Sequence, residues 1–530
     1  MSYAGGAGLN REKLCLEGTG KELLQEIVDW INNVEKDPPR IFWLHGPAGT
    51  GKSSIAHTIA HRFQQLERLG SCFCFDRSQM AERCHQKVFS TIAQDLANRD
   101  TSLRRQLTAV VHGNAALKNT TDILQQWEEL IAKPATALSE AIMGPIVIII
   151  DALDESGDNN SRRVLLRILG NAIAESRITG LPPNLRILLT SRPLPDIYAA
   201  LNGGTHVRQK SMDSLPPDST ERDILRYVSG QLSEVGFEVP SQEVFATLAG
   251  SSGQIFEWAR LACAYIKGDS NAGTGLEPHE RFEAIITHSK NDHVPLLDGI
   301  YQFTLETIFP KEQPPSQRDR GLKRFGSVMA QILGTMEPLS LGSLASMRSH
   351  FKDLAEINIR TIVAPMAALL SGATDPSFPI RPLHSSFADF LTDRDRSHEF
   401  FIDVYSIHKD LAFASLGVMT KQLQFNICDL QSSYLRNSEV LDLDDRIKKY
   451  IPAELAYSCR LWTDHVRQAP FNSALATEVQ ALFNNERLLF WFEVLGLLNV
   501  VNTCDGLLGS LIQWVTVCRI TFEYKLRSDL

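Results

Sequence analysis

The sequence has no long run of lysine or arginine, although 53 of its 530 residues are basic. Acidic residues number 62, which gives a formal net charge of −9. A surface with this balance of acidic and basic residues offers no basic patch for a polyanion, so we expect no nucleic-acid partner. The first six residues (MSYAGG) also lack the basic and apolar segments of a secretory signal.

Long hydrophobic runs are missing as well. The most apolar late stretch, 488–520, is interrupted by Glu493, Asn499, Asn502 and Asp505. A membrane-spanning helix needs about 20 consecutive apolar residues, so we expect buried helices here and no membrane partner. No internal repeat and no long heptad pattern is present.

Cysteine is present without the paired spacing that zinc sites use. The nine cysteines are scattered, and the one close pair, Cys72 and Cys74, lies in an alternating segment typical of a strand. Both sulfurs would then face one side of a sheet, which favours core packing over a metal or redox role. Unpaired cysteines fit a reducing compartment, and we expect a cytoplasmic protein.

The length and composition indicate a folded protein of several domains. A chain of 530 residues exceeds what one hydrophobic core supports, so two to four domains are expected. The apolar share of 43% and the charged share of 22% are ordinary for soluble proteins, so disorder is not the default.

Residues 40–210 alternate short apolar runs with longer amphipathic segments, the pattern of a parallel sheet with crossover helices. Predicted strands are Ile41–Leu44, Ser71–Phe75, Ile146–Ile150, Leu185–Leu189 and a weaker one near His206–Val207. Predicted helices cover 53–69, 82–98, 121–142 and 161–176, with an amphipathic helix ahead of them at 20–34. After a turn cluster at 214–219 the chain is mainly helical, with loop-like boundaries at 268–277 and 310–317.

A phosphate-binding loop is predicted where GPAGTGKS fits the pattern G-x-x-x-x-G-K-[ST] between an apolar strand and a helix. Its glycines let the backbone N–H groups turn inward, where they and the positive end of the helix hold a polyphosphate. Lys52 would contact the β- and γ-phosphates, and the Ser53 hydroxyl would bind Mg²⁺. The predicted nucleotide-binding residues are Gly46, Pro47, Ala48, Gly49, Thr50, Gly51, Lys52, Ser53 and Ser54.

An acidic cluster follows the most apolar predicted strand. Asp151 comes directly after Ile146–Ile150, and phosphoryl chemistry needs a carboxylate at such a strand end. We expect Asp151 to hold Mg²⁺ directly or through a water ligand, and Glu155, with Asp154 as the alternate, to polarise the attacking water.

A third predicted strand ends in Thr190, Ser191 and Arg192, which places a guanidinium at the edge where open α/β sheets bind ligands. Arg192 would contact the γ-phosphate with two hydrogen bonds, or, alternatively, pair with a local carboxylate at the surface.

Taken together, the loop at 46–53, the segment Ile146–Glu155 and the segment Leu189–Pro193 resemble the NACHT-type STAND class of P-loop NTPases. The resemblance is strongest to the fungal set related to heterokaryon-incompatibility proteins and to the nephrocystin-3-type N-terminal NTPase domain. It implies an α/β P-loop NTPase with a three-layer parallel sheet, followed by α-helical, winged-helix and further α-helical domains. In the family, the strand ending at Arg192 lies between the phosphate-loop strand and the Asp151 strand.

The resemblance also implies domain boundaries. They are a flexible lead at 1–19, a nucleotide-binding domain at 20–212, a small helical domain at 213–315, a winged-helix domain at 316–395 and a helical domain at 396–530. Residues 253–259 match a family segment whose role is mostly packing, with departures at Gln254 and Glu257. The family's usual N-terminal effector domain and C-terminal repeats have no counterpart, so we expect protein partners to supply effector or sensor functions.

The family's His-x-Ser-Phe pattern occurs at His384, and the resemblance implies that this imidazole contacts the β-phosphate of a bound diphosphate. The function it implies is a signalling switch that binds and slowly hydrolyses ATP or GTP with Mg²⁺, retains ADP or GDP at rest, and assembles into a homo-oligomer on activation. The alternatives are a P-loop kinase, an AAA-type motor, or a nucleotide-binding scaffold without turnover. Judged without the family, a histidine beside Phe387 and Phe390 would be a core residue.

Overall fold

The computed structural model describes most of the chain in two compact units. Unit 1 comprises Met1–Gly268, Gly275–Ile300 and His384–Ser386, and unit 2 includes Tyr301–Leu383 and the residues from Phe387 onward. The described residues are 1–501 without 34–37, 136–143, 173–184, 269–275, 290–294, 352, 354, 374, 433 and 485, and then 504, 506–509, 511, 512, 514 and 516.

Unit 1 contains a five-stranded parallel sheet with the strand order β2-β3-β4-β1-β5. The strands are β1 (Ile41–His45), β2 (Leu69–Cys74), β3 (Ile146–Asp151), β4 (Leu185–Ser191) and β5 (Val207–Ser211). All five predicted strands are present, and β4 lies between β1 and β3 as the family resemblance implies. The predicted fold class, a P-loop α/β domain followed by helical domains, is confirmed.

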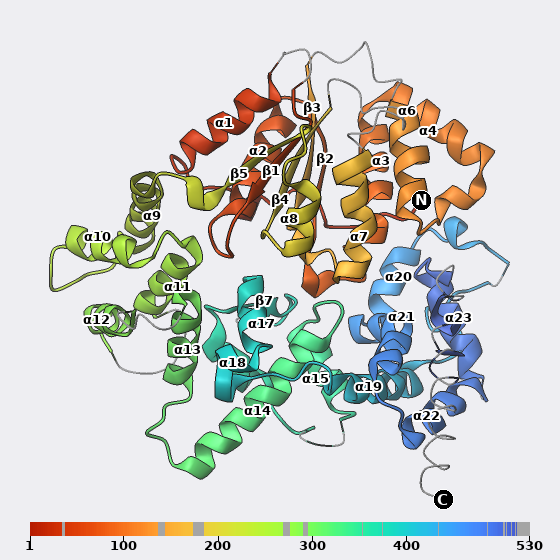
Figure 1. Ribbon diagram of the computed structural model, residues 1–530. Helices are drawn as coiled ribbons and strands as arrows, with labels where there is room; N and C mark the ends of the chain where they lie inside the picture. The colour runs from red at the N-terminus through yellow and green to blue at the C-terminus, as the bar shows by residue number, and fades with distance from the viewer. Residues whose placement is uncertain are drawn as a thin grey trace, which may run out of the picture. The chain divides into compact units, whose positions relative to one another are not determined.

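Helices cover both faces of the sheet because its inner strands, β1, β3 and β4, are buried on both sides. Along β3, Ile146, Ile148 and Ile150 belong to one buried cluster and Val147 and Ile149 to the other. The first cluster is closed by α3 (Val88–Arg99), α4 (Thr101–Gly113), α7 (Asn159–Arg167) and the neighbouring short helices, and the second by α1 (Lys21–Ile31) and α2 (Lys52–Gln65). Figure 1 shows these two sets of helices on opposite sides of the strands, which makes three layers.

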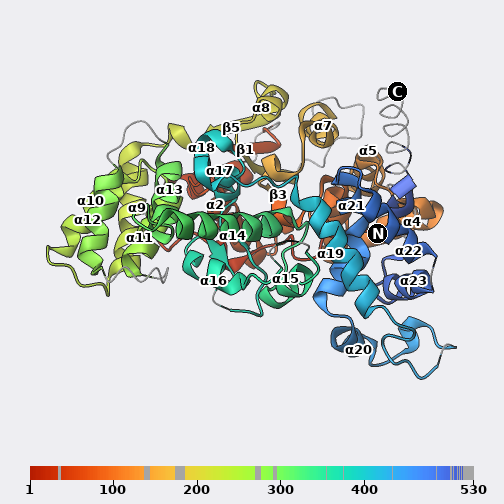
Figure 2. The same ribbon diagram turned by 90° about the horizontal axis from the view of Figure 1, so that it is seen from below.

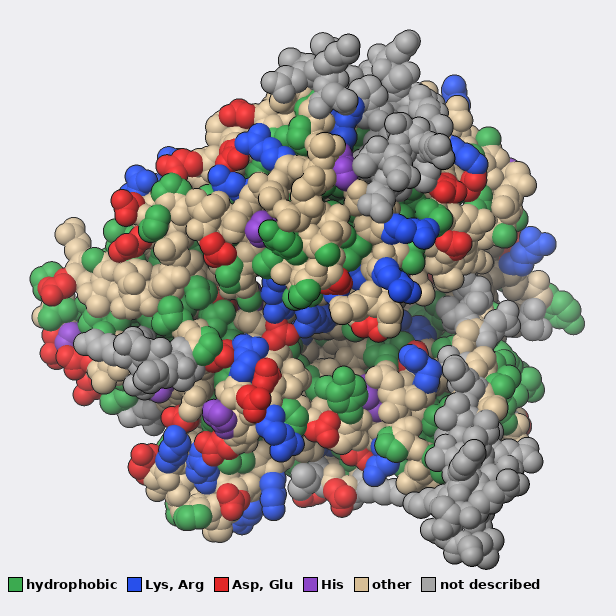
Figure 3. All heavy atoms as spheres, in the orientation of Figure 1, with side chains coloured by type: hydrophobic (Ala, Val, Ile, Leu, Met, Phe, Trp, Pro, Cys, Tyr) green, Lys and Arg blue, Asp and Glu red, His purple; other side chains and the backbone are tan. Residues whose placement is uncertain are grey.

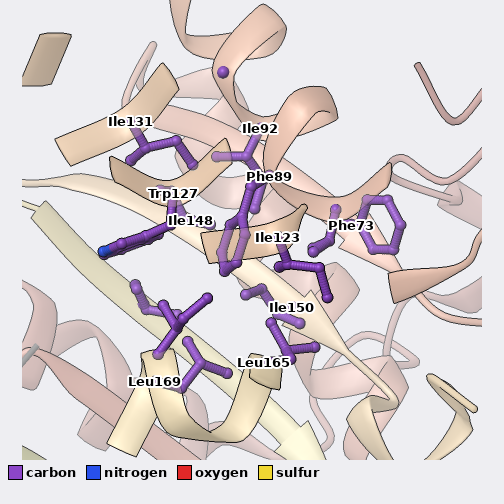
Figure 4. Close-up of a cluster of buried hydrophobic side chains, with 14 of the residues drawn as sticks. Phe73, Phe89, Ile92, Ile123, Trp127, Ile131, Ile148, Ile150, Leu165 and Leu169 are labelled. Carbon is purple, nitrogen blue, oxygen red and sulfur yellow. The ribbon is translucent and has the colours of Figure 1, made fainter. Parts of the chain in front are cut away.

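Aromatic side chains fill the first of these clusters. Phe89 and Trp127 lie with their ring centroids 5.0 Å apart, and Figure 4 shows them in one cluster with Ile148 and Ile150 of β3. Leu165 comes to the same cluster from α7. Burial of large apolar side chains of this kind stabilises each by roughly 1.5–3 kcal/mol, so the cluster fixes the strand ends that follow it.

The helices of the sheet domain agree with the predictions in place but less well in length. Helix α2 ends at Gln65 because β2 begins at Leu69, and α3 begins only at Val88, after two short 3-10 turns. The segment predicted as 121–142 starts as α5 and continues as a π-helix to Ala132, and α4 was not predicted. The far ends of 121–142 and 161–176, and most of the boundary at 268–277, lie outside the described residues. The helices are α1 (Lys21–Ile31), α2 (Lys52–Gln65), α3 (Val88–Arg99), α4 (Thr101–Gly113), α5 (Ile123–Gln125), α6 (Lys133–Ala135), α7 (Asn159–Arg167) and α8 (Pro195–Leu201).

The N-terminal residues differ from the flexible lead that the sequence predicts. Ala4 and Ala7 are each 1% exposed, and the Cys74 backbone N–H of β2 donates to the Ala7 carbonyl at 2.8 Å. Two alanines carry no periodic signal, but their small side chains allow this segment to lie close against the sheet edge. The segment is therefore a packed part of unit 1.

A group of helices follows the sheet in the chain. They are α9 (Pro217–Leu232), α10 (Ser241–Ser251), α11 (Phe256–Lys267), α12 (Pro278–Ser289) and α13 (Leu296–Ile308). Helix α13 continues past Ile300 into unit 2. The helical character of this region agrees with the prediction.

After the end of α13, the described residues of unit 2 form three helices and a two-stranded antiparallel sheet. These are α14 (Pro315–Gly334), α15 (Leu341–Arg348), α16 (Ile359–Val363), β6 (Leu370–Ser371) and β7 (Arg381–Pro382), with α17 (Ser385–Leu391) next in the chain. Ser340 forms an isolated bridge with Pro379. Helices and short antiparallel strands are what a winged-helix domain contains, but that assignment and the domain boundaries stay predictions.

Further helices follow in the described part of unit 2. Its helices are α18 (Arg394–Ser397), α19 (Ile407–Gln422), α20 (Leu443–Tyr450), α21 (Ala453–Gln468), α22 (Ser473–Phe483) and α23 (Arg487–Leu497). Helices α19 and α21 pack side by side (Figures 1 and 2). Among the described residues, no helix is both long and apolar enough to cross a membrane. Acidic and basic side chains are interspersed over the face shown in Figure 3.

Candidate functional site

The predicted phosphate loop joins β1 to α2, with Lys52 as the first residue of the helix. Gly49 and Gly51 have φ values of 79° and 93°, a left-handed conformation that glycine adopts without steric cost. The Lys52 ammonium donates to the carbonyls of Gly46 at 2.9 Å and Pro47 at 2.6 Å. Burial lowers the pKa of Lys52 to about 8, although the nearby Asp154 carboxylate opposes the shift.

The start of α11 packs directly on this loop. The Glu257 backbone N–H donates to the Gly49 carbonyl at 3.1 Å. A Cβ atom at Gly49 would lie 2.8 Å from the Glu257 Cβ and 2.9 Å from the Ile255 Cγ2. Gly49 is therefore required for close packing as well as for its backbone conformation.

Asp151 lies at the carboxyl end of β3, where it accepts two hydroxyl hydrogen bonds. Its Oδ1 accepts from the Ser53 Oγ at 3.1 Å and from the Thr190 Oγ1 at 2.5 Å, and the residue is 2% exposed. These groups come from α2, β3 and β4, so the sheet order brings together two predicted Mg²⁺ residues. Carboxylate and hydroxyl oxygens are the donors that Mg²⁺ prefers, so the donor set fits the ion.

A turn after β3 separates the three acidic residues. Ala152 has a φ of 57°, which is uncommon for a residue with a Cβ and is supported by a hydrogen bond from its N–H to the Thr190 Oγ1. Beyond the turn, the Asp154 carboxylate accepts from the Arg192 backbone N–H at 3.0 Å and from its Nε at 2.7 Å. Arg192 thus forms the local ion pair weighed as the alternative to a phosphate contact, and the γ-phosphate contact stays a prediction.

The geometry distinguishes Glu155 from Asp154, the other candidate for the residue that polarises water. Both Asp154 oxygens are engaged by Arg192, and Asp154 is 5% exposed. One Glu155 oxygen accepts from the Arg77 backbone N–H at 3.2 Å. Burial, and then the Asp154 charge, raise the pKa of Glu155 to about 7, while the Ser385 hydroxyl opposes both. A carboxyl group that titrates near neutrality is suited to accept a proton from water, so the arrangement favours Glu155 over Asp154 as the base.

His384 and its two neighbours belong to unit 1 by their contacts. The Ser386 backbone N–H donates to the His384 Nδ1 at 3.2 Å, and the Ser386 hydroxyl lies 2.6 Å from the same nitrogen. A nitrogen that accepts from a backbone N–H carries no proton, so the neutral ring carries its proton on Nε2. Burial lowers the pKa of His384; the Glu257 charge opposes the shift, and Arg260, Lys52 and Arg192 add to it.

Sequence reasoning missed two groups that contact the Asp151 carboxylate or lie beside it. Thr190 was noted only as a polar strand end, yet its hydroxyl joins Asp151 to the Ala152 turn. His57 was not considered, and its Nε2 lies 4.0 Å from the Asp151 Oδ2. Its one sequence signal is its position four residues after Ser53, which places both on the same face of α2.

One comparison with known protein families covers this site. The family model described as Nephrocystin 3, N-terminal, matches residues 18–192. No curated protein matches the chain. Among solved structures, the crystal structure of the FIGL-1 AAA domain is similar with a TM-score of 0.29 and 16% identity, covering 58% of this chain and 89% of that one. The structure of Drosophila ORC bound to GC-rich DNA and Cdc6 has a TM-score of 0.24 and 10% identity, covering 90% and 69%.

TM-scores this low carry no information on function, so the family match has the greater weight. The matched residues include the phosphate loop, Asp151, Asp154 and Glu155, and they end at Arg192. Residues 18–192 are therefore similar to the nephrocystin-3 N-terminal family, and they contain a P-loop nucleotide-binding domain.

Proposed function

We propose that the protein is a nucleotide-dependent signalling switch of the NACHT type. It binds ATP or GTP with Mg²⁺, hydrolyses the triphosphate slowly and holds the diphosphate in its resting state. Because a ligand shifts a conformational equilibrium only by its different affinity for the two states, the protein needs a group that distinguishes diphosphate from triphosphate.

Binding rests on the phosphate loop. The Lys52 ammonium, which donates to two loop carbonyls, would transfer its hydrogen bonds to the β- and γ-phosphates. Ser53 and Asp151 would hold Mg²⁺, which neutralises phosphate charge when it is bound. Asp154 would keep the Arg192 guanidinium at the strand edge, where it adds positive potential beside the phosphates.

Hydrolysis rests on Glu155. Its carboxylate would accept a proton as water attacks the γ-phosphate, and a pKa of about 7 leaves about half of the carboxyl groups ionised at neutral pH. Slow turnover is what a switch requires, because the time spent with triphosphate bound sets the duration of the signal.

The observation that carries the proposal is the environment of His384. Its charged neighbours are Glu257, Arg260, Lys52 and Arg192, two of which are predicted phosphate-site residues. Its Nδ1 is held by Ser386, which leaves the Nε2 proton as a donor for a phosphate oxygen. One hydrogen bond to a charged partner contributes about 1.5–3 kcal/mol, enough to bias the switch by roughly tenfold or more.

The experiment compares thermal melting of wild type and His384→Ala with ADP, with ATP and without nucleotide. Stabilisation by a ligand follows its affinity and concentration, so the variant should lose much of the ADP-induced shift and little of the ATP-induced shift. Equal losses with both nucleotides would contradict the proposal.

A matched control is His465→Leu, which removes a fully buried histidine of unit 2. We expect a lower melting temperature under all three conditions and unchanged nucleotide-induced shifts. The nucleotide released when the purified wild-type protein is denatured gives a second test. ADP or GDP would support a resting switch, whereas turnover that depends on an added phosphate acceptor would indicate a kinase.

A further inference from the structure

The N-terminal segment, residues 2–10, is held against β2 and α3 by its backbone. The Ala4 N–H donates to the Thr91 Oγ1 at 3.0 Å, and the Ala7 carbonyl accepts from the Cys74 N–H at 2.8 Å. Ala4 and Ala7 are almost fully buried. The segment therefore has a defined position with respect to the sheet, and this fixes the positions of its backbone N–H and C=O groups.

One of these backbone groups reaches α2. The Asn10 N–H donates to the Nδ1 of His57 at 3.2 Å, and His57 is 1% exposed. A backbone N–H can only donate, so Nδ1 must be the acceptor and the neutral imidazole must carry its proton on Nε2. The N-terminal segment thus selects one of the two tautomers of His57.

The Nε2–H of His57 lies beside the Asp151 carboxylate. It is 4.0 Å from the Asp151 Oδ2 and 3.6 Å from the Cys74 Sγ. The other oxygen, Oδ1, accepts from Ser53 and Thr190. The carboxylate therefore accepts hydroxyl hydrogen bonds on one oxygen, and the buried N–H lies beyond hydrogen-bonding distance on the side of the other, where its positive end favours this orientation electrostatically.

A metal site made from His57, Cys72 and Cys74 is the competing interpretation, because their ligand atoms all lie within 4.8 Å of one another. The hydrogen bond from Asn10 argues against it, since Nε2 cannot bind a metal while it carries the proton. The hydrogen bond with Cys72, and then burial, raise the pKa of the Cys74 thiol well above its ordinary value, which disfavours the thiolate that a metal needs.

We propose that His57 is a positioning residue for Asp151 and that the N-terminal segment controls it through the Asn10 N–H. The proposal rests on the Mg²⁺ role given to Asp151 under the proposed function. If the segment leaves the sheet, the His57 proton can move to Nδ1, and the Nε2 lone pair then faces the carboxylate. Repulsion between the two displaces Asp151 and weakens the Mg²⁺ site. The packing of residues 2–10 is thereby linked to the nucleotide site.

The first test measures metal affinity directly. Full-length wild type, His57→Leu and His57→Gln are titrated with Mn²⁺ in the presence of ADP and followed by electron paramagnetic resonance. Loss of a group that orients a metal ligand costs roughly tenfold or more in affinity, so His57→Leu should bind Mn²⁺ about tenfold more weakly. His57→Gln keeps a donor and an acceptor and should recover most of the affinity. ADP affinity in EDTA should be equal in all three.

The second test concerns the backbone of Asn10. Asn10→Pro removes the N–H and should weaken Mn²⁺ binding as His57→Leu does, whereas Asn10→Ala keeps the N–H and should match wild type. Combining Asn10→Pro with His57→Leu should cost no more than His57→Leu alone, because the two act in one chain of contacts. Additive losses, or equal affinity in all variants, would overturn the proposal.

A measurement on the wild type keeps the proposal testable if a variant does not fold. Nitrogen chemical shifts of ¹⁵N-labelled histidine distinguish the two tautomers, and we expect the His57 proton on Nε2. A proton on Nδ1, or stoichiometric zinc in the purified protein, would overturn the proposal. Wild type that binds no nucleotide at all would instead overturn the proposed function, whatever the His57 variants show.

Discussion

Two buried polar clusters, one in each unit, differ in what surrounds them. In unit 2, the Met336 N–H donates to the Tyr457 Oη at 3.1 Å, Oη lies 2.6 Å from the His465 Nε2, and the His465 Nδ1 lies 2.9 Å from the His408 Nδ1. Donors and acceptors alternate along this chain if Tyr457 donates to His465 and His465 donates to His408. Both ring nitrogens of His465 are then satisfied.

The cluster at the sheet edge of unit 1 has equally short contacts, but two of its groups, Lys52 and Glu155, titrate in a different pH range. Burial lowers the pKa of His465 to about 3, which keeps that ring neutral at any physiological pH. Burial instead brings the pKa of Lys52 to about 8 and that of Glu155 to about 7. Buried polar networks are therefore not in themselves a sign of function. A better sign of function is a group near the strand ends whose charge changes near neutral pH, as those of Lys52 and Glu155 do.

Among the variants that test this comparison, Glu155→Gln should have the largest effect. The amide keeps the size of the side chain but cannot accept the proton from water, and general-base catalysis contributes about 10²–10⁴-fold to a rate. We expect triphosphate affinity to be retained and turnover to fall by about 100-fold, measured as phosphate release under single-turnover conditions. Asp154→Asn is the neighbouring control. If Asp154→Asn loses as much turnover as Glu155→Gln while keeping Arg192 in place, the choice of base is wrong.

Lys52→Ala should have the next largest effect. It removes a charge-assisted contact worth about 1.5–3 kcal/mol, so nucleotide affinity should fall by roughly tenfold or more. Calorimetric titration with ATP and GTP measures this change. The melting temperature without nucleotide should stay close to that of wild type, because the hydrogen bonds of the ammonium in the free protein are to the carbonyls of its own loop. Unchanged affinity would refute the assignment of the phosphate loop.

Tyr457→Phe tests the unit 2 side of the comparison. The variant keeps the ring but leaves the Met336 N–H and the His465 Nε2 without the hydroxyl, and an unsatisfied buried polar group costs about 1–3 kcal/mol. We expect a lower melting temperature and an unchanged nucleotide-induced shift. A change in nucleotide affinity instead would show that this cluster communicates with the phosphate site.

The smallest predicted effect is that of pH on turnover. Glu155 acts as a base only when ionised, and its raised pKa of about 7 means that turnover should fall by about fivefold from pH 7 to pH 6. Above pH 8 nucleotide affinity should decline, because Lys52 loses its charge there. The pH dependence of kcat and the pH dependence of KM should therefore change slope at different pH values. In Glu155→Gln, the acid limb of the kcat profile should disappear.

Much of the sheet domain was predictable because its signals are local. Strands buried on both faces are continuous apolar runs, such as Ile146–Ile150, and the phosphate loop is a contiguous pattern bounded by a strand and a helix. Helix α4 was missed because Leu103 and Leu107 are its only buried residues, which is too weak an apolar stripe to recognise. The N-terminal segment was missed because its buried contacts are made by the backbone and by two alanines, which form no recognisable apolar pattern.

The individual residues of the site were predictable from the sequence, but the contacts between them were not. Sequence spacing cannot separate Asp154 from Glu155, since the left-handed turn at Ala152 decides which carboxylate meets Arg192. Likewise, Thr190 reaches Asp151 only because β4 lies beside β3, which requires the sheet order. The family resemblance supplied that order, whereas the hydrogen bonds at the strand ends depend on side-chain positions that no pattern encodes.

The N-terminal segment has a further consequence for self-association. An outer strand of a sheet exposes unpaired N–H and C=O groups that invite pairing with another chain, and β2 is such a strand. The hydrogen bond from Cys74 to Ala7 occupies one of these groups, and the buried alanines keep the segment against the strand. While the segment stays in place, another chain could not pair with the Cys74 end of β2 without displacing it.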